Sequence, residues 1–370
     1  MRAFITGGMG FIGQALARRL LGEGHEVVIL DSLIPQVHGD APLTAVPEGA
    51  RFVRGDVREL RERADLIEGC DVVFHLAAET GTAQSMYRIQ HYVGANEGGV
   101  AALLEGVAQC RRRPRKIVLA SSRSVYGEGA YRDAAGRLRQ PPPRTKQQLE
   151  AAQWELVGED GAELTAIPTP ETLGFAPGSV YAATKAAQEL LLASAGEALG
   201  VEAAILRFQN VYGEGQSLQN PYTGIISIFF NRARQGLGLP IYEDGRETRD
   251  FVHVDDVVAA LLAAARRELP PGAVCNVGSG VATTVAGLAQ GLLVAAGLEV
   301  EVEVTGQFRV GDIRHNFADI ARARELLDFV PQVSLEAGLA RFCAWAATQP
   351  VYGDRLDQAT AELRRKGLAR

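Results

Sequence analysis

The sequence predicts an α/β protein with a doubly wound parallel sheet and a smaller, mixed α/β C-terminal lobe. Two observations predict this class. Short, continuous runs of apolar residues alternate with helical patterns through the first half of the chain, and strands that are buried on both faces of a parallel sheet have this composition. A glycine-rich turn also follows the first apolar run directly, at residues 6–13.

The elements of the first half alternate between strand and helix. The ranges that indicate strands are Arg2–Thr6, Glu26–Leu30, Arg51–Val53, Val72–Leu76, Lys116–Ser121 and Glu202–Phe208. The ranges that indicate helices are Gln14–Gly22, Arg58–Glu68, Tyr92–Arg111 and Tyr181–Leu199. Such an alternation is typical of parallel strands that are joined by crossover helices.

The pattern becomes mixed after Gly213. We expect strands near 241–243, 274–277 and 300–304, and helices near 225–235, 256–267, 285–296, 320–327 and 335–347. The expected organisation is one domain at 1–212 and a second lobe at 213–370, from which a segment at about 245–267 returns to the first domain. The polar, proline-rich stretch 128–178 has a helical patch at 145–156 and indicates a surface excursion, or alternatively a lid or an oligomer contact.

The composition excludes several classes of protein. The chain has 370 residues, 47% of them hydrophobic, and a net charge of −6, which argues against disorder and against a nucleic-acid-binding surface. Its four cysteines are far apart, so neither a zinc site nor a disulfide framework is indicated. No apolar run approaches the roughly 18–20 residues that span a membrane, and no signal peptide precedes the first strand. We therefore expect a cytoplasmic protein that binds neither a membrane nor a metal.

The turn at 6–13 (TGGMGFIG) has the features of a dinucleotide-binding turn in a Rossmann fold. Gly7, Gly10 and Gly13 let the backbone approach a pyrophosphate, and the following helix offers its N-terminal N–H groups to the phosphates. Asp31 ends the second strand, where a carboxylate accepts hydrogen bonds from ribose hydroxyls and repels a 2′-phosphate. The sequence therefore predicts NAD, rather than NADP, as the cofactor.

Further cofactor contacts are expected where the next strands end. Asp56 would lie beside the adenine or, equally, would cap a helix. Small side chains follow His75, which we expect to be structural, and would let the cofactor lie over the strand ends. The complete set of expected cofactor contacts is Gly7, Gly10, Phe11, Ile12, Gly13, Asp31, Asp56, Val57, Leu76, Ala77, Ala78, Asn96, Ser121, Tyr181 and Lys185.

Tyr181 and Lys185 form a YxxxK pair whose spacing places both side chains on one face of a helix. A tyrosine with a pKa near 10 is a poor base, but a nearby ammonium and the positive nicotinamide ring favour the phenolate. Ser122 ends the preceding strand of the sheet and would supply a hydroxyl near the reacting oxygen. Ser122, Tyr181 and Lys185 are therefore the candidate catalytic residues.

These motifs, together with RFQNVYGEGQ at 207–216 and RDFVHVDDV at 249–257, resemble the extended short-chain dehydrogenase/reductase superfamily, in its nucleotide-sugar epimerase/dehydratase branch. The resemblance implies hydride chemistry on a sugar hydroxyl by Ser122, Tyr181 and Lys185. It also implies that Asn210 and two arginines, Arg249 and Arg309, face the nucleotide diphosphate, and guanidinium groups do bind phosphate oxygens bidentately.

The residues after Ser122 discriminate between the reactions of this family. Its sugar 4,6-dehydratases carry Asp-Glu there, and its decarboxylases carry Glu in place of Ser124. Here the residues are Arg123 and Ser124, with no carboxylate. The remaining groups suffice for a 4-epimerase, which works through a 4-keto intermediate and leaves NAD unchanged.

A closer resemblance is to the dTDP-L-rhamnose 4-epimerase group, which interconverts dTDP-L-rhamnose and dTDP-6-deoxy-L-talose. It rests on residues 32–39, 81–99 and 215–229, on the Ser-Arg pair at 122–123 and on the insertion before Tyr181. Some members carry cysteine pairs in that insertion and this chain has none, which argues against a structural metal. Met86 could instead be a packing residue. The expected substrate contacts are Thr82, Ser85, Met86, Ser122, Arg123, Gln209, Asn210, Arg249 and Arg309.

Three alternatives remain open from the sequence. A UDP-hexose or UDP-uronate 4-epimerase would share the chemistry and differ only in the pocket. A sugar 4-ketoreductase would usually use NADPH, which Asp31 disfavours, and a catalytically silent protein would tend to lose the Tyr181–Lys185 pair. For the assembly, the resemblance implies a homodimer through a four-helix bundle, with Tyr92–Arg111 and Tyr181–Leu199 as the helices.

Overall fold

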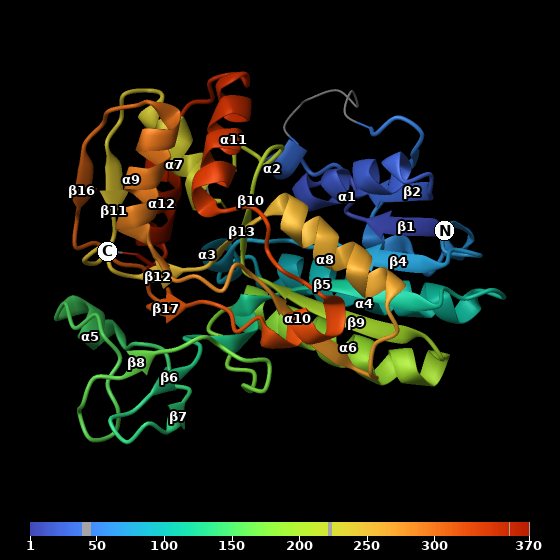
Figure 1. The fold of residues 1–370 in the computed structure, drawn as a ribbon, viewed down its shortest axis with the longest axis horizontal. Helices are drawn as coiled ribbons and strands as arrows, with labels where there is room; N and C mark the ends of the chain where they lie inside the picture. The colour runs from blue at the N-terminus through green and yellow to red at the C-terminus, as the bar shows by residue number, and fades with distance from the viewer. Residues whose placement is uncertain (39–45, 221–223, 355, 370) are drawn as a thin grey trace.

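The computed structural model describes residues 1–38, 46–220, 224–354 and 356–369. At its centre lies a parallel sheet of seven strands in the order β14-β9-β5-β4-β1-β2-β3 (Figure 1). The order reverses between β1 and β4, and open α/β sheets bind ligands at the carboxyl ends of the strands beside such a reversal. These strands are β1 (Arg2–Thr6), β2 (Glu26–Asp31), β3 (Arg51–Arg54), β4 (Val72–His75), β5 (Lys116–Ser122), β9 (Glu202–Phe208) and β14 (Ala273–Val277).

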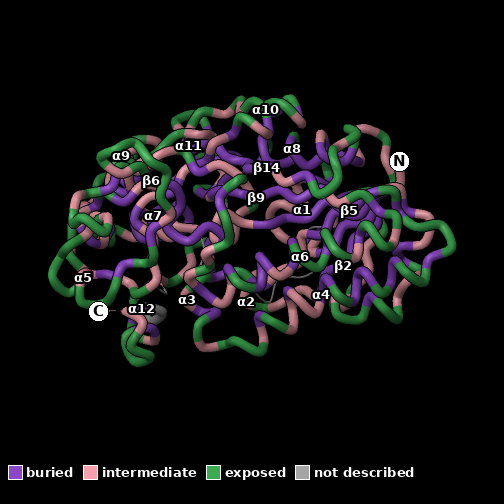
Figure 2. Tube along the Cα trace, turned by 90° about the horizontal axis from the view of Figure 1, so that it is seen from below, coloured by how far each residue is buried: buried purple, intermediate pink, exposed green. Residues whose placement is uncertain are grey.

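Helices cover both faces of this sheet, as the predicted doubly wound class requires. The apolar sides of α1 (Phe11–Gly22), α8 (Val254–Arg266) and α10 (Ala321–Leu327) form one core with the sheet. The other face packs against α4 (Ile89–Gln109) and α6 (Val180–Leu199). The strands other than the edge strand β3 are mostly buried (Figure 2), which explains why they consist of apolar runs.

The second lobe has a core of its own, in which aromatic rings from distant segments meet. Phe230 of α7 (Ile225–Ala233) and Phe342 of α11 (Leu335–Ala347) pack edge to face with ring centroids 5.8 Å apart. Around them lie α9 (Val285–Ala296), the parallel pair β11 (Leu239–Ile241) and β16 (Val302–Val304), and α12 (Leu356–Arg365). Three strands, β15 (Thr283–Thr284), β12 (Thr248–Arg249) and β17 (His315–Asn316), form a small sheet next to this core.

The stretch 128–178 is more ordered than its composition indicates. It contains a three-stranded sheet in the order β7-β6-β8 and one short helix, and it extends from the side of the second lobe (Figure 1). Its elements are β6 (Tyr131–Arg132), β7 (Leu138–Arg139), β8 (Thr165–Ala166) and α5 (Lys146–Glu150). The helical patch expected at 145–156 is therefore confined to its first residues.

Most predicted elements of the sheet and the long helices are present within a few residues of their expected bounds. The helix predicted at Arg58–Glu68 is wrong, because two short 3-10 helices, Val57–Glu59 and Ala64–Leu66, stand there. Residues 39 and 221–223 of the motifs quoted above lie outside the described residues. Elements that the sequence did not indicate include α2 (Pro35–His38), α3 (Thr82–Ser85), β10 (Asn210–Tyr212), β13 (Phe251–His253) and α12, as well as the short strands of the two three-stranded sheets.

Candidate active site

The glycine-rich turn between β1 and α1 is too tightly packed for side chains. Gly7 has φ +68, and a Cβ atom on it would lie 2.7 Å from the backbone nitrogen of Ala77. A Cβ atom on Gly13 would lie 2.4 Å from the carbonyl oxygen of Gly7. Gly10 caps α1 without a side chain, which leaves the N-terminus of this helix open toward a ligand. The turn therefore fits a dinucleotide pyrophosphate.

The two acidic residues expected at the cofactor have different surroundings. Asp31 is 8% exposed, and its carboxylate accepts hydrogen bonds from the backbone N–H groups of Met9 (3.0 Å) and Leu33 (2.9 Å), which fixes it beside the glycine-rich turn. Asp56 caps the first 3-10 helix and is bound by the guanidinium of Arg58, which lowers the pKa of the carboxyl. Of the two roles left open for Asp56, the structure shows the cap.

Two other residues expected to contact the cofactor, Asn96 and Ser121, form hydrogen bonds within the protein near the carboxyl edge of the sheet. The Asn96 amide accepts a hydrogen bond from Glu79 N–H and donates to Thr184 Oγ1, so it joins the loop after β4 to α6. Ser121 donates to Glu189, which is also paired with Arg207. These contacts place Asn96 and Ser121 in the framework of the site.

The three candidate catalytic residues meet where β5 ends and α6 begins. Ser122 and Tyr181 both line the same cavity, and the Ser122 hydroxyl lowers the pKa of the Tyr181 phenol. Lys185 lies one turn further along α6, is 4% exposed, and donates from Nζ to the Ala120 carbonyl of β5 at 2.9 Å. Ser85 accepts a hydrogen bond from Tyr181 N–H at 3.0 Å and so fixes the start of the helix.

Burial acts on the ionisation of both side chains of the YxxxK pair. It raises the pKa of the Tyr181 phenol above its ordinary value, against the lowering effects of the Ser122 hydrogen bond and the Arg123 charge. It also lowers the pKa of the Lys185 ammonium to about 7. The groups that favour the Tyr181 phenolate in this structure include Ser122 and Arg123.

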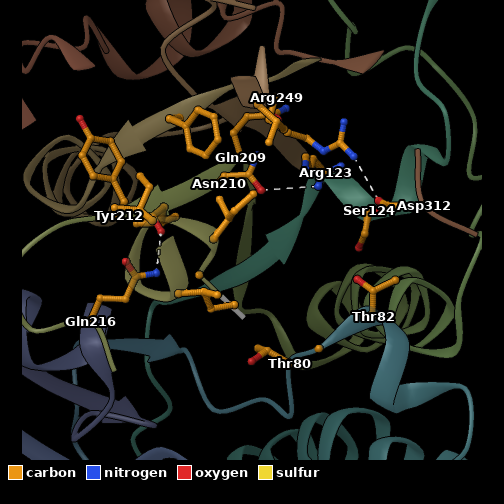
Figure 3. Close-up of a pocket in the computed structure, with 18 of the residues that line it drawn as sticks. Thr80, Thr82, Arg123, Ser124, Gln209, Asn210, Tyr212, Gln216, Arg249 and Asp312 are labelled. Carbon is orange, nitrogen blue, oxygen red and sulfur yellow. Dashed lines mark hydrogen bonds and ion pairs between the residues drawn. The ribbon is translucent and has the colours of Figure 1, made fainter. Parts of the chain in front are cut away.

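A cavity of about 470 Å³ opens in front of these residues, between the carboxyl edge of the sheet and the second lobe. Figure 3 shows side chains from both halves of the chain pointing into it. Its predicted lining residues are Phe11, Ile12, Thr82, Ser122, Arg123, Tyr181, Gln209, Asn210, Arg249 and Arg309. Ser85 and Met86 are not among the lining residues: Ser85 is buried, and its hydroxyl donates to the Thr82 carbonyl, while Met86 is 40% exposed.

Three arginines that line the cavity differ in how many partners their guanidinium groups have among the described residues. Arg249 donates to the carboxylate of Asp312 (3.1 Å) and to several backbone carbonyls, so its position is fixed from behind. Arg309 stacks on the Tyr242 ring at 4.9 Å, and its Nε has no partner in the described structure. Arg123 reaches only Asn210 Oδ1, at 3.5 Å (Figure 3), and has no carboxylate partner among the described residues. Burial and the Arg249 charge lower the pKa of Arg123 to about 10.

Several uncharged or protonated groups also face the cavity without partners in the described part of the chain. Both amide atoms of Gln209 and the hydroxyl of Ser124 are buried and unpaired. One carboxylate oxygen of Glu247 accepts no hydrogen bond there and is only 4.0 Å from Arg314 Nη1, and burial raises the pKa of this group to about 7. Buried polar groups normally have partners, so these atoms indicate a polar ligand.

Sequence reasoning missed several residues of this cavity. Glu247 precedes Arg249 by two residues, which is the spacing of neighbours on one face of a strand, and that spacing was the available signal for Glu247. Asp312 follows Arg309 by three residues, which is not such a spacing, so this signal did not extend to Asp312. Tyr212 and Gln216 lie within the motif at 207–216 but were not singled out, and no pattern in the sequence pointed to Thr80, Tyr242 or Leu356.

No helix in the described ranges is long and apolar enough to cross a membrane. In the same ranges, no group of three His, Cys, Asp or Glu side chains is placed to hold a metal ion.

Comparison with known proteins identifies the relatives of this chain. Residues 3–278 match the model of the NAD dependent epimerase/dehydratase family. The chain is 39% identical over 352 residues to a dTDP-L-rhamnose 4-epimerase of Burkholderia thailandensis, covering 94% of this chain and 95% of that protein. Two similar solved structures each cover 94% of this chain and 99% of their own at 29% identity. They are MoeE5 in complex with UDP-glucuronic acid and NAD (TM-score 0.75) and a UDP-glucose 4-epimerase of Thermotoga maritima with UDP-glucose (TM-score 0.76).

Proposed function

The chain belongs to the NAD dependent epimerase/dehydratase family, and from that premise we propose that it is a nucleotide-sugar 4-epimerase that interconverts dTDP-L-rhamnose and dTDP-6-deoxy-L-talose. It is an NAD-dependent enzyme of the epimerase class, and NAD is its cofactor. The identity of the sugar, the location in the cytoplasm and the division into a cofactor domain at 1–212 and a sugar lobe at 213–370 are parts of this proposal.

One observation carries the choice of reaction. Ser122 and Tyr181 both line the cavity, and the two residues that follow Ser122 are Arg123 and Ser124. Elimination of water from the sugar needs an acid and a base next to the reacting carbons. The residues at 123 and 124 supply neither a carboxylic acid nor a carboxylate, which supports epimerisation over dehydration.

Ser122 of β5 and Tyr181 and Lys185 of α6 each have a role in this reaction. When bound, NAD would take up the hydride from C4 of the sugar and return it. The Tyr181 phenolate oxygen accepts the proton of the O4 hydroxyl and later returns it, and the Ser122 hydroxyl orients that oxygen. Lys185 would hold the nicotinamide ribose, while Arg309 and Arg123 offer unsatisfied donors to the diphosphate.

The similarity to the Burkholderia protein supports the dTDP-6-deoxyhexose assignment. A second candidate, a UDP-uronate 4-epimerase, is favoured by Arg123. A neutral 6-deoxysugar does not require a cation beside Ser122, whereas a sugar carboxylate would pair with one. If the diphosphate satisfies Arg123 instead, a neutral sugar fits as well.

An exchange assay tests the function and separates the candidates. Purified protein is incubated with dTDP-L-rhamnose, UDP-glucose and UDP-glucuronate in turn, without added cofactor, and the sugar is followed by NMR. Conversion of dTDP-L-rhamnose to its C4 epimer is the expected result. Conversion of UDP-glucuronate alone would favour the second candidate. Conversion of none of the three substrates would contradict the proposed 4-epimerase activity.

The proposed assembly is a homodimer in which α4 and α6 of each copy form a four-helix bundle. Large apolar side chains stay exposed on both helices: Val93 is 37% exposed, Leu190 58% and Leu191 39%. A second copy of the same helices would cover them, because such an interface is self-complementary about a twofold axis.

A further inference from the structure

The excursion 128–178 lies along one segment of the second lobe, from Phe308 to Ala318. At one end the Trp154 ring packs against the Phe308 ring, with centroids 6.4 Å apart. At the other, the Thr169 N–H donates to the Phe317 carbonyl at 2.8 Å, and Thr169 pairs with Ala318 as a β-bridge. The excursion therefore supports this segment along its whole length.

Arg144 of the excursion makes buried contacts with this lobe. It is 4% exposed, and its guanidinium binds both carboxylate oxygens of Glu243, at 2.8 and 2.9 Å. The same guanidinium donates to the Asp312 carbonyl at 3.0 Å and to the Trp154 carbonyl at 3.1 Å. Glu243 has φ 50, a conformation that is uncommon for a residue with a side chain, and its paired carboxylate is held on two sides.

Arg314 extends this cluster to the end of the same segment. Its side chain is fully buried and bonds to Glu155 of the excursion and to Glu243 and Asp244 of the lobe. Its backbone N–H donates to the Glu128 carboxylate at 2.7 Å. The segment 312–314 is thus fixed by buried charges from the excursion.

That segment in turn holds a cation of the cavity. Arg249 donates to the Asp312 carboxylate, to the Ile313 carbonyl at 2.7 Å and to the Arg314 carbonyl at 3.1 Å. Arg249, Arg309 and Asp312 all line the cavity, so the segment supplies or positions three of its charged groups. A displacement of residues 312–314 would move the cavity wall that faces the diphosphate.

We propose that the excursion 128–178 is a positioning element of the nucleotide-binding wall, in which Arg144 holds residues 312–314 and thereby fixes Arg249. This inference rests on the proposed function in taking the cavity as the site of a nucleotide diphosphate. Arg144 touches no lining side chain of the sheet edge, and Ser122, Tyr181 and Lys185 lie on other elements. Its loss should therefore weaken binding and leave the chemical step intact.

The test is Arg144→Lys, which keeps one positive charge and loses the planar, bidentate contact that lets one group reach both Glu243 and the Asp312 carbonyl. The matched control is Arg137→Gln in the same excursion, because Arg137 is exposed and, among the described residues, its side chain pairs only with Asp133. Binding of dTDP and of UDP to NAD-loaded protein is measured by calorimetry. Steady-state kinetics with the sugar that reacts, hydrogen exchange of amides 309–315 and thermal unfolding are measured on the same samples.

Arg144→Lys should weaken binding of the nucleotide diphosphate about tenfold and raise KM to a similar extent, with kcat within about twofold of the wild type. Amides 309–315 should exchange faster, and Arg137→Gln should leave all of these values unchanged. Unchanged nucleotide binding, or a fall in kcat at constant KM, would overturn the proposal.

A second variant covers the case in which Arg144→Lys does not fold. Trp154→Leu removes the ring contact with Phe308 without touching the charged cluster, and it should also weaken nucleotide binding; undiminished binding would overturn the proposal. A wild-type protein that binds neither dTDP nor UDP would instead refute the proposed function, and the inference with it.

Discussion

Tyr181 lies where burial and hydrogen bonding act on its phenol in opposite directions. Burial raises the pKa, and the Ser122 hydroxyl and the Arg123 charge lower it. A base must release and accept the same proton in one catalytic cycle, so a pKa close to the working pH is useful. The positive ring of the bound cofactor adds a further charge that favours the phenolate.

Replacement of this base should abolish most turnover without removing the cofactor. In Tyr181→Phe we expect kcat to fall by roughly 10²–10⁴-fold, the contribution typical of a general base, while the NAD content of the purified protein stays that of the wild type. Turnover is measured by NMR and NAD by its release on denaturation. Tyr352→Phe, in the second lobe, is the control, and near-normal turnover of Tyr181→Phe would refute the assignment.

Glu247 makes a pH-dependent contribution to stability. Burial raises its pKa from 4.5 to about 7, so the folded protein binds a proton that the unfolded chain has already lost in this interval. Stability therefore decreases as the pH rises from about 4.5 to 7 and then levels off. The Tm of Glu247→Gln should exceed that of the wild type by an amount that grows between about pH 4.5 and 7 and stays constant above pH 7. A difference in Tm that does not vary with pH would contradict this prediction.

The turn between β1 and α1 depends on glycine residues, which have no side chain. A Cβ atom at Gly13 would meet the Gly7 carbonyl oxygen and the Gly8 backbone at 2.4 and 2.6 Å, and backbone atoms cannot move aside as a flexible side chain can. The close approach of α1 to β1 therefore requires glycine. The same approach brings the helix N-terminus to the pyrophosphate.

Gly13→Ala should open this turn. We expect a lower Tm and a reduced NAD content, both measured on freshly purified protein. Gly22→Ala is the matched control, since a Cβ atom at Gly22, in the same helix, would meet no atom within 4 Å and alanine favours the helix. Full retention of NAD in Gly13→Ala would show that the turn tolerates a side chain.

The structure of the excursion 128–178 could not be predicted from its composition. Proline and polar residues predicted an irregular stretch, whereas the structure contains a small sheet that is held by buried ion pairs. Arg144 and Glu243 are 99 residues apart in the chain. No local pattern around either residue could indicate that they would pair.

The whole molecule brings two cores together around one cavity. The sheet and α6 carry the glycine-rich turn and the candidate catalytic residues, and the second lobe supplies Arg249, Arg309 and Glu247 to the cavity. β14 and α10 come from the second half of the chain but pack with the sheet. The chain therefore crosses between the two cores more than once, which fixes their relative position at the cavity.

The proposed dimer can be tested at this scale. Wild-type protein should elute as a dimer in size-exclusion chromatography with light scattering. Val93→Glu combined with Leu190→Glu should give a monomer. Both side chains are exposed, on α4 and α6, and charged residues at these positions would repel each other across a twofold axis. Val294→Glu, 83% exposed on α9, is the control. A monomeric wild type would contradict the proposal.

The sequence by itself determined the features that depend on near neighbours in the chain. The strands of the sheet, the glycine-rich turn and the spacing of Tyr181 and Lys185 follow from local composition and from the periods of strand and helix. Tertiary structure alone decided the features that depend on burial and on distant partners: the cap formed by Asp56, the raised pKa of Glu247, and the hold of Arg144 on the segment behind Arg249. Desolvation and charge pairing depend on what surrounds a group in space, and the order of residues does not specify those surroundings until the chain has folded.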